Sequence, residues 1–191
     1  MRLQTGTQLI DESTEKQWES FLRTLRKEKE PDSAAMQDGR AFETLVNACA
    51  MFTQDKVECD DADWLEAGRR FGKLCAGGVQ QVRVEKKKRI AGEDFKLVGV
   101  ADVVKAGRIF DIKKVVRYEY GKYFESTQHP MYFELMPGAI RFDYLIFDGK
   151  LCYTETYRRG DFISIESTIK QFADYLHDAG LWDEYKNNWE V

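Results

Sequence analysis

Apolar residues follow a helical period in some parts of the chain and a period of two in others. In the first part they recur at intervals of three and four residues in three stretches, 12–29, 40–52 and 61–75. This spacing predicts three amphipathic helices, the last of which ends at Gly77-Gly78. The first third of the chain is therefore expected to be helical.

From residue 79 onwards apolar and polar residues alternate, which is typical of strands. The pattern predicts one strand over 79–90 and two more within 97–116, which a tight turn at Ala106-Gly107 joins. A second hairpin is expected over 140–161, where alternation resumes.

Helical spacing returns on either side of the second hairpin. Residues 124–135 keep this spacing but include Pro130, so the regular helix either begins near His129 or kinks at the proline. A final helix is expected from Ser164 to about Gly180.

Composition favours one globular domain. The 191 residues are 43% hydrophobic and 32% charged, enough for one good core, so residues 1–191 are interpreted as a single domain. Within it we expect a helical part over about 12–76 and a sheet-containing core over about 78–180. The sequence has no run of 18 apolar residues and no apolar signal core at its start, which favours a cytoplasmic protein without a membrane partner.

The net charge of −4 means that any contact with nucleic acid must come from local basic patches and bound metal. The four cysteines, Cys49, Cys59, Cys75 and Cys152, form no CxxC pair, so reduced thiols are expected rather than a zinc site or disulfides. No GxxxxGK[ST] motif is present, which excludes a nucleotide cofactor of that kind.

The strands within 97–116 carry the strongest chemical signal. If their turn is symmetric about Ala106-Gly107, Asp102 lies directly opposite Asp111, and Lys113 projects from the same face as Asp111. Like charges opposite one another are destabilising and need a compensating cation, for which a divalent metal is the natural candidate. Mg²⁺ binds carboxylates, waters and phosphate oxygens, and a lysine can polarise a water or a phosphate. The cluster therefore suits cleavage of a phosphodiester.

Glu43 is the third candidate carboxylate. The polar linker before residue 40 ends in Asp38-Gly39, which would place Glu43 near a helix start, where the helix dipole favours a carboxylate. It either points towards the sheet or is a solvated first-turn residue.

Two segments could bind nucleic acid. The basic run over 86–89 is either a solvated strand edge or a phosphate contact. Further on, Tyr118, Tyr120 and Tyr123 interleave with basic residues, a mix suited to stacking on bases, although core and edge aromatics are the commoner explanation.

Four short motifs in order resemble the PD-(D/E)xK nuclease superfamily, and within it the RecB-like and phage-exonuclease branch. GRAFE at 39–43 resembles the helix start that carries a His or Glu ligand, GVAD at 99–102 the GxxD strand, and DIK at 111–113 the (D/E)xK strand. QHPMY at 128–132 matches the QxxxY helix of the RecB branch. The resemblance implies an α/β fold, with a central mixed β-sheet of about five strands flanked by helices in a restriction-endonuclease-like core.

The resemblance also implies a metal-dependent DNA nuclease, an exonuclease of phage-type recombination, repair or DNA processing. It assigns catalytic roles to Glu43, Asp102, Asp111, Lys113, Gln128 and Tyr132. Asp102 and Asp111 would bind Mg²⁺ or Mn²⁺, with the Ile112 carbonyl completing the shell and Glu43 ligating directly or through water. Lys113 would activate the attacking water, and Gln128 would hold either the substrate or Lys113, supported by Tyr132.

Glu43 departs from the family pattern, since many RecB-type members have His there, and it makes the expected ligand set all oxygen. Salt-sensitive DNA binding is expected from Lys86, Lys87, Lys88, Arg89, Lys114, Arg117 and Lys122.

Two other classes of protein remain open. One is a non-catalytic nucleic-acid-binding or inhibitor module with the nuclease fold. The other is a structural subunit, suggested by the aromatic tail LWDEYKNNW at 181–189. A homo-oligomer or a phage or repair partner protein is compatible with either.

Overall fold

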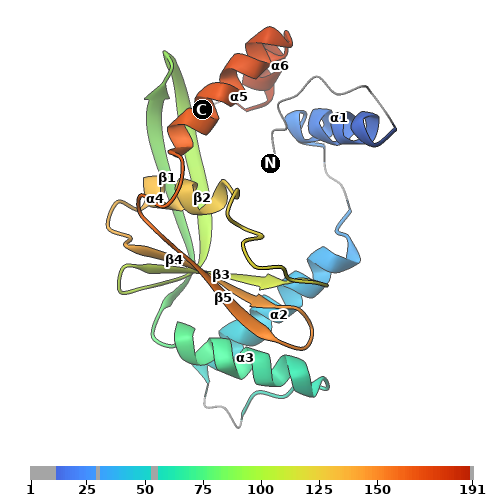
Figure 1. Ribbon diagram of the computed structural model, residues 1–191, viewed down its shortest axis with the longest axis vertical. Helices are drawn as coiled ribbons and strands as arrows, with labels where there is room; N and C mark the ends of the chain where they lie inside the picture. The colour runs from blue at the N-terminus through green and yellow to red at the C-terminus, as the bar shows by residue number, and fades with distance from the viewer. Residues whose placement is uncertain (1–11, 29–30, 53–55, 190–191) are drawn as a thin grey trace. The chain divides into compact units, whose positions relative to one another are not determined.

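The computed structural model describes residues 12–28, 31–52 and 56–189. Along this part of the chain the elements are α1 (Glu12–Leu25), α2 (Ala34–Met51), α3 (Ala62–Cys75), β1 (Val79–Ile90), β2 (Glu93–Lys105), β3 (Arg108–Lys114), α4 (Gln128–Leu135), β4 (Arg141–Phe147), β5 (Cys152–Arg158), α5 (Ile165–Asp178) and α6 (Trp182–Asn188) (Figure 1). The fold is α/β, as predicted, with five strands in one mixed sheet.

The chain divides into two compact units. The core unit consists of Asp32–Lys86 and Leu97–Ile163, and so contains α2, α3, α4, β3, β4, β5 and most of β1 and β2. The terminal unit combines the far end of the β1–β2 hairpin, Lys87–Lys96, with α1, α5 and α6. All six candidate catalytic residues belong to the core unit.

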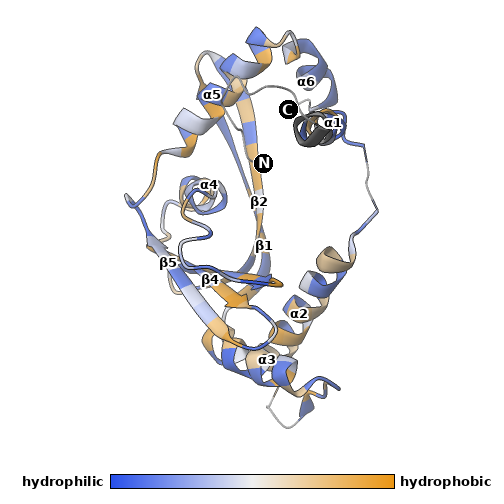
Figure 2. Cartoon of the chain, turned by 45° about the vertical axis from the view of Figure 1, so that its right-hand side comes forward, coloured by the Kyte–Doolittle hydropathy of each residue, from blue (hydrophilic) through white to orange (hydrophobic). Residues whose placement is uncertain are grey.

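The strands of the sheet follow one another in sequence order, β1-β2-β3-β4-β5. β2 and β3 are antiparallel, as are β4 and β5, whereas β3 and β4 run parallel. A parallel pair cannot be joined by a tight turn, and here the chain crosses over through α4 (Figure 1). Helix α4 lies on one side of the sheet, and α2 and α3 lie on the other (Figure 2).

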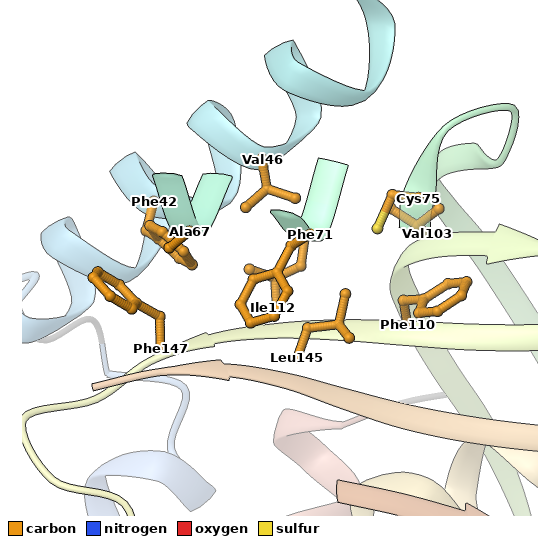
Figure 3. Packing of buried hydrophobic residues seen from close by; sticks show 10 residues of the cluster. All are labelled: Phe42, Val46, Ala67, Phe71, Cys75, Val103, Phe110, Ile112, Leu145 and Phe147. Carbon is orange, nitrogen blue, oxygen red and sulfur yellow. The ribbon is translucent and has the colours of Figure 1, made fainter. Parts of the chain in front are cut away.

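The main apolar cluster of the core unit fills the space between the sheet and the α2–α3 pair. Phe110 and Ile112 of β3 point towards these helices and pack with residues such as Phe42 of α2 (Figure 3). The two helices approach closely because α3 carries Gly72, where an added Cβ would lie 2.8 Å from the backbone carbonyl carbon of Cys49. Since strand side chains alternate between the two faces of a sheet, Asp111, between Phe110 and Ile112, faces the α4 side.

The start of α2 differs from the prediction. The helix begins at Ala34, six residues before the expected start, because Ser33 caps it by accepting a hydrogen bond from the Met36 N–H at 3.3 Å. The stretch ending in Asp38-Gly39 is therefore helix rather than linker. Glu43 lies in the third turn, so the expected stabilisation by the helix dipole at a first turn is wrong.

Most other predicted elements are confirmed. α3 has Asp61 as its N-cap, and α5 has Ser164. The regular helix after β3 begins at Gln128, which agrees with the first of the two alternatives for the Pro130 segment. The short helix α6 was not predicted.

The aromatic tail packs within the terminal unit. Trp182 of α6 stacks on His177 at 4.4 Å between ring centroids and meets Phe95 edge-on at 6.2 Å. Trp189 donates a hydrogen bond from Nε1 to the Leu25 carbonyl at 2.8 Å. These contacts give the tail a role within its own chain.

None of the described helices is long and apolar enough to cross a membrane. The cysteines Cys49, Cys59, Cys75 and Cys152 form no disulfide with one another.

Candidate active site

The turn between β2 and β3 sets the register of the candidate site. Ala106 and Gly107 have φ angles of 48° and 75°, the left-handed values that a tight two-residue hairpin turn requires. The paired residues are Val103 with Phe110, Val104 with Ile109 and Lys105 with Arg108, which is the predicted register. Continued by one step, this register sets Asp102 opposite Asp111.

The Asp102 carboxylate lies just beyond the last of these pairs, Val103 with Phe110. Its Oδ2 accepts a hydrogen bond from the Ile112 backbone N–H at 2.7 Å. In a continued ladder this N–H would point to the backbone carbonyl of Ala101. The Asp102 carboxylate oxygen thus replaces a main-chain carbonyl as the acceptor for Ile112, at the point where β2 and β3 reach the candidate site.

Asp111 is the most buried of the candidate acids, with 4% of its surface exposed. The Gln128 amide Nε2 donates a hydrogen bond to its Oδ1, and the Lys113 ammonium lies 2.7 Å from its Oδ2. This contact between Lys113 and Asp111 is an ion pair. Burial raises the pKa of Asp111, and the charge of Lys113 opposes the rise.

The two aspartates influence each other. Burial, and next the charge of Asp111, raise the pKa of Asp102 to about 7, while the hydrogen bond from Ile112 opposes the shift. A raised pKa is the expected behaviour of a buried acid that lies close to a second acid. A divalent cation would favour the ionised form of both.

Glu43 approaches this pair from α2. Burial raises its pKa first, and the charge of Asp111 raises it further, so the two carboxylates lie within electrostatic range. Its Oε1 accepts a hydrogen bond from the Gln81 amide Nε2. Glu43 is therefore neither a free surface residue nor a demonstrated metal ligand.

The strand residue Gln81 was not identified from the sequence. Its φ of 51° is left-handed, which is uncommon for a residue other than glycine and unusual inside a strand such as β1. This backbone conformation accompanies the contact between its side chain and Glu43. The alternation of residues along β1 contains no signal for it.

Helix α4 rests directly on β2. The Tyr132 hydroxyl donates a hydrogen bond to the Val100 carbonyl, and burial raises the pKa of Tyr132, which keeps it a donor. The approach depends on Gly99, where an added Cβ would lie 2.9 Å from Tyr132 Cε1 and 2.9 Å from Leu135 Cδ1.

The sequence analysis expected Gln128 to hold either Lys113 or the substrate, and its partner within the chain is a different residue. The Gln128 amide N–H binds the Asp111 carboxylate instead, because that oxygen is an acceptor beside the helix start, while Lys113 already pairs with the other oxygen. Gln128 and Lys113 thus hold the two oxygens of one carboxylate.

The predicted basic residues are divided between the two units. Lys87, Lys88 and Arg89 belong to the terminal unit, whereas Lys86, Lys114, Arg117 and Lys122 belong to the core unit. Several have partners within the chain. Lys86 pairs with Glu134 at 2.6 Å and Lys88 pairs with Glu166.

No protein-family model matches the chain, and no curated protein matches it. A solved structure similar to this chain is described as "Crystal structure of SSO0001". It has 16% sequence identity and a TM-score of 0.47, and the match covers 85% of this chain and 85% of that chain. A likeness at this level carries no conclusion about function.

The described residues contain no group of three or more His, Cys, Asp or Glu side chains arranged to hold a metal ion. The candidate site offers two close carboxylates, Asp102 and Asp111, together with the Ile112 backbone next to them. Mg²⁺ uses one or two carboxylates and fills its remaining positions with water and substrate oxygens. This all-oxygen donor set fits Mg²⁺ or Mn²⁺.

The sequence analysis also missed Glu155 of β5. This buried carboxylate accepts hydrogen bonds from the Tyr118 hydroxyl at 2.7 Å, the Tyr123 backbone N–H at 3.2 Å and the Tyr157 hydroxyl. A signal existed, because alternation along β5 places an acid at an inward position between Tyr153 and Tyr157.

Proposed function

We propose that this chain is a metal-dependent deoxyribonuclease of the cytoplasm, an exonuclease that hydrolyses phosphodiester bonds in recombination, repair or DNA processing. What supports the proposal is the arrangement of Asp102, Asp111 and Lys113, in which two acids with raised pKa values lie beside one lysine. Clustered acids cost stability in a protein that has no use for them, so their retention favours a site that binds a cation.

The side chains have separate roles in this proposal. A bound Mg²⁺ or Mn²⁺ would neutralise charge on the phosphate and lower the pKa of a bound water. Asp102 and Asp111 would hold it, with the Ile112 carbonyl beside them. Gln128 fixes the orientation of Asp111 through Oδ1, so that the carboxylate does not have to be ordered when substrate binds.

Lys113 supplies a positive charge from the protein itself, in addition to that of a bound metal ion. An ammonium has three donors, and the ion pair with Asp111 leaves donors available for a phosphate oxygen or the attacking water. Its side chain is 30% exposed, so substrate can reach it. Glu43, held by Gln81, would hold or orient a water at the edge of the site.

The experiment that tests the proposal is digestion of end-labelled linear DNA and closed circular DNA with Mg²⁺, Mn²⁺ or EDTA. We expect loss of the linear substrate alone, only with metal, and no loss with Lys113→Ala. Lys170→Ala is the matched control, since Lys170 pairs with Asp174 on the surface of α5 and should leave the rate unchanged. Cleavage by Lys113→Ala at the wild-type rate, or wild-type cleavage in EDTA, would contradict the proposal.

A non-catalytic nucleic-acid-binding or inhibitor subunit is the second candidate. The observation that favours it is the pairing of both Asp111 oxygens within the chain, by Gln128 and Lys113. Calorimetry with Mn²⁺ separates the two candidates. The nuclease should bind the ion and lose this binding in Asp111→Ala, whereas a binding-only module should give no heat of Mn²⁺ binding.

A further inference from the structure

The segment over 115–127, here called the aromatic loop, connects β3 to α4 (Figure 1). It exposes large apolar side chains. Tyr120 is 94% exposed, Val116 91% and Phe124 64%. Such exposure is unfavourable for a phenol ring and for aliphatic groups, and several of these side chains in one short loop mark a surface for binding.

The loop is nevertheless firmly anchored. The buried Glu155 carboxylate accepts hydrogen bonds from the Tyr118 hydroxyl and from the Tyr123 backbone N–H. The Tyr123 ring stacks on the Tyr144 ring, with centroids 4.4 Å apart and planes at 14°. The loop tyrosines therefore divide into two that face inward as anchors and one, Tyr120, that faces solvent.

The anchoring holds Tyr120 ready for a ligand. Successive backbone turns support it, with hydrogen bonds from Lys122 N to the Glu119 carbonyl at 3.1 Å and from Phe124 N to the Gly121 carbonyl at 3.0 Å. A ring displayed on a pre-ordered loop loses little conformational entropy on binding.

The loop starts and ends at the candidate active site. Val116 is three residues from Lys113, so their Cα atoms lie at most about 11 Å apart, and Phe124 lies at most about 14 Å from Gln128. Both ends of the loop therefore lie near the candidate site. The loop also supplies two cations that suit a phosphate backbone, Lys122 and Arg117, and Arg117 has 83% of its side chain exposed and pairs with Glu119 of the same loop at 3.1 Å.

We infer that the aromatic loop is a stacking subsite for unpaired bases, and that it directs single-stranded DNA to the site formed by Asp102, Asp111 and Lys113. The inference rests on the proposed function and extends it to the strand form of the substrate. Tyr120 stacks on the face of a base. Every nucleotide has such a face, but in a duplex the neighbouring bases cover it. Arg117 and Lys122 contact phosphates of the same strand.

The experiment measures DNA binding in EDTA, where cleavage does not interfere. Fluorescence anisotropy compares a labelled single strand of about 20 nucleotides with the duplex of the same sequence, a length that exceeds common single-strand site sizes. The proteins are the wild type, Tyr120→Ala, Tyr120→Phe and Phe52→Ala. Phe52, at the end of α2, is the matched control because it is an exposed aromatic residue outside the loop, at 55% exposure.

Tyr120→Ala should weaken binding to the single strand by about 5-fold to about 150-fold, the range for loss of one stacked base, and leave duplex binding unchanged. Tyr120→Phe keeps the ring and should keep the affinity, and Phe52→Ala should match the wild type. An equal loss on both forms, or no loss, overturns the inference even if the wild type cleaves DNA.

Two further outcomes are distinguishable. If the wild type binds neither form of DNA and does not cleave it, the proposed function fails together with the inference. If Tyr120→Ala keeps its affinity for the single strand but loses self-association in sedimentation, the loop binds a second copy of the chain and the inference is wrong.

Discussion

His129, the second residue of α4, should make the stability of the protein depend on pH. Its ring is fully buried and stacks on the Tyr157 ring, with centroids 4.0 Å apart and planes at 10°. Its Nδ1 lies 3.2 Å from the Tyr144 hydroxyl, and its Nε2 has no partner among the described residues. Burial lowers the pKa of His129 to about 4, and the charge of Asp161 only weakly opposes this.

The direction of the effect follows from this lowered pKa. The unfolded chain binds a proton at its ordinary pKa of about 6.5, whereas the folded protein resists protonation until about pH 4. The contribution of His129 is therefore complete above about pH 6.5 and is lost as the pH falls through the window between these values. At about 1.4 kcal/mol for each pKa unit, the loss between about pH 7.5 and pH 5 is roughly 2 kcal/mol.

The measurement is the free energy of unfolding in urea at several pH values, for the wild type and for His129→Phe. Other groups titrate over the same range, but they cancel in the difference between the two proteins. We expect this difference to be constant above about pH 6.5 and to shift by roughly 2 kcal/mol in favour of the phenylalanine variant at about pH 5.

Phe52→Ala provides the control. It removes an exposed side chain that does not titrate, and its curve should stay parallel to that of the wild type. A difference between the wild type and His129→Phe that does not change from pH 7.5 to pH 5 would refute the assignment of His129 as a neutral buried ring.

Three further predictions concern how the candidate site is held. Gly99→Ala should destabilise the core unit by about 1–3 kcal/mol in urea unfolding, because the added methyl group overlaps Tyr132 and Leu135; unchanged stability would show that α4 shifts freely. Glu43→Gln should keep the melting temperature and lower the rate of DNA cleavage strongly, since an amide is a poorer partner for a hard cation. Cleavage at the wild-type rate would show that Glu43 has no role in catalysis. Arg159→Ala should lower the free energy of unfolding by about 1 kcal/mol, because one NH2 group of its guanidinium lies within hydrogen-bond distance of four carbonyls in the last turn of α4 and the segment after it. An unchanged urea midpoint in Arg159→Ala would argue against that cap.

The elements that the sequence predicted well are those with local causes. The register of β2 and β3 follows from one turn, since two left-handed residues at Ala106-Gly107 determine the three pairs next to it. The start of α2 was missed for a local reason as well. Ser33 is a typical N-cap residue, whereas the Asp38-Gly39 pair is typical of a turn. The helix begins after the Ser33 cap and continues through Asp38-Gly39.

The features that could not be predicted depend on contacts between distant segments. The partner of Gln128 is set by how α4 crosses the sheet, and the left-handed backbone of Gln81 accompanies its contact with Glu43. Pattern and propensity describe single segments, so they place residues on a face but do not choose between neighbouring acceptors.

The parallel pairing of β3 with β4 has a consequence for the order of folding. The β2–β3 hairpin is local and can form early, but β4 can join β3 only after the chain has closed the long crossover through the aromatic loop and α4. The hairpin brings Asp102 and Asp111 together before Gln128 reaches them. We therefore expect the two acids to repel one another in the folding transition state, so that neutralising Asp102 speeds folding more than it slows unfolding.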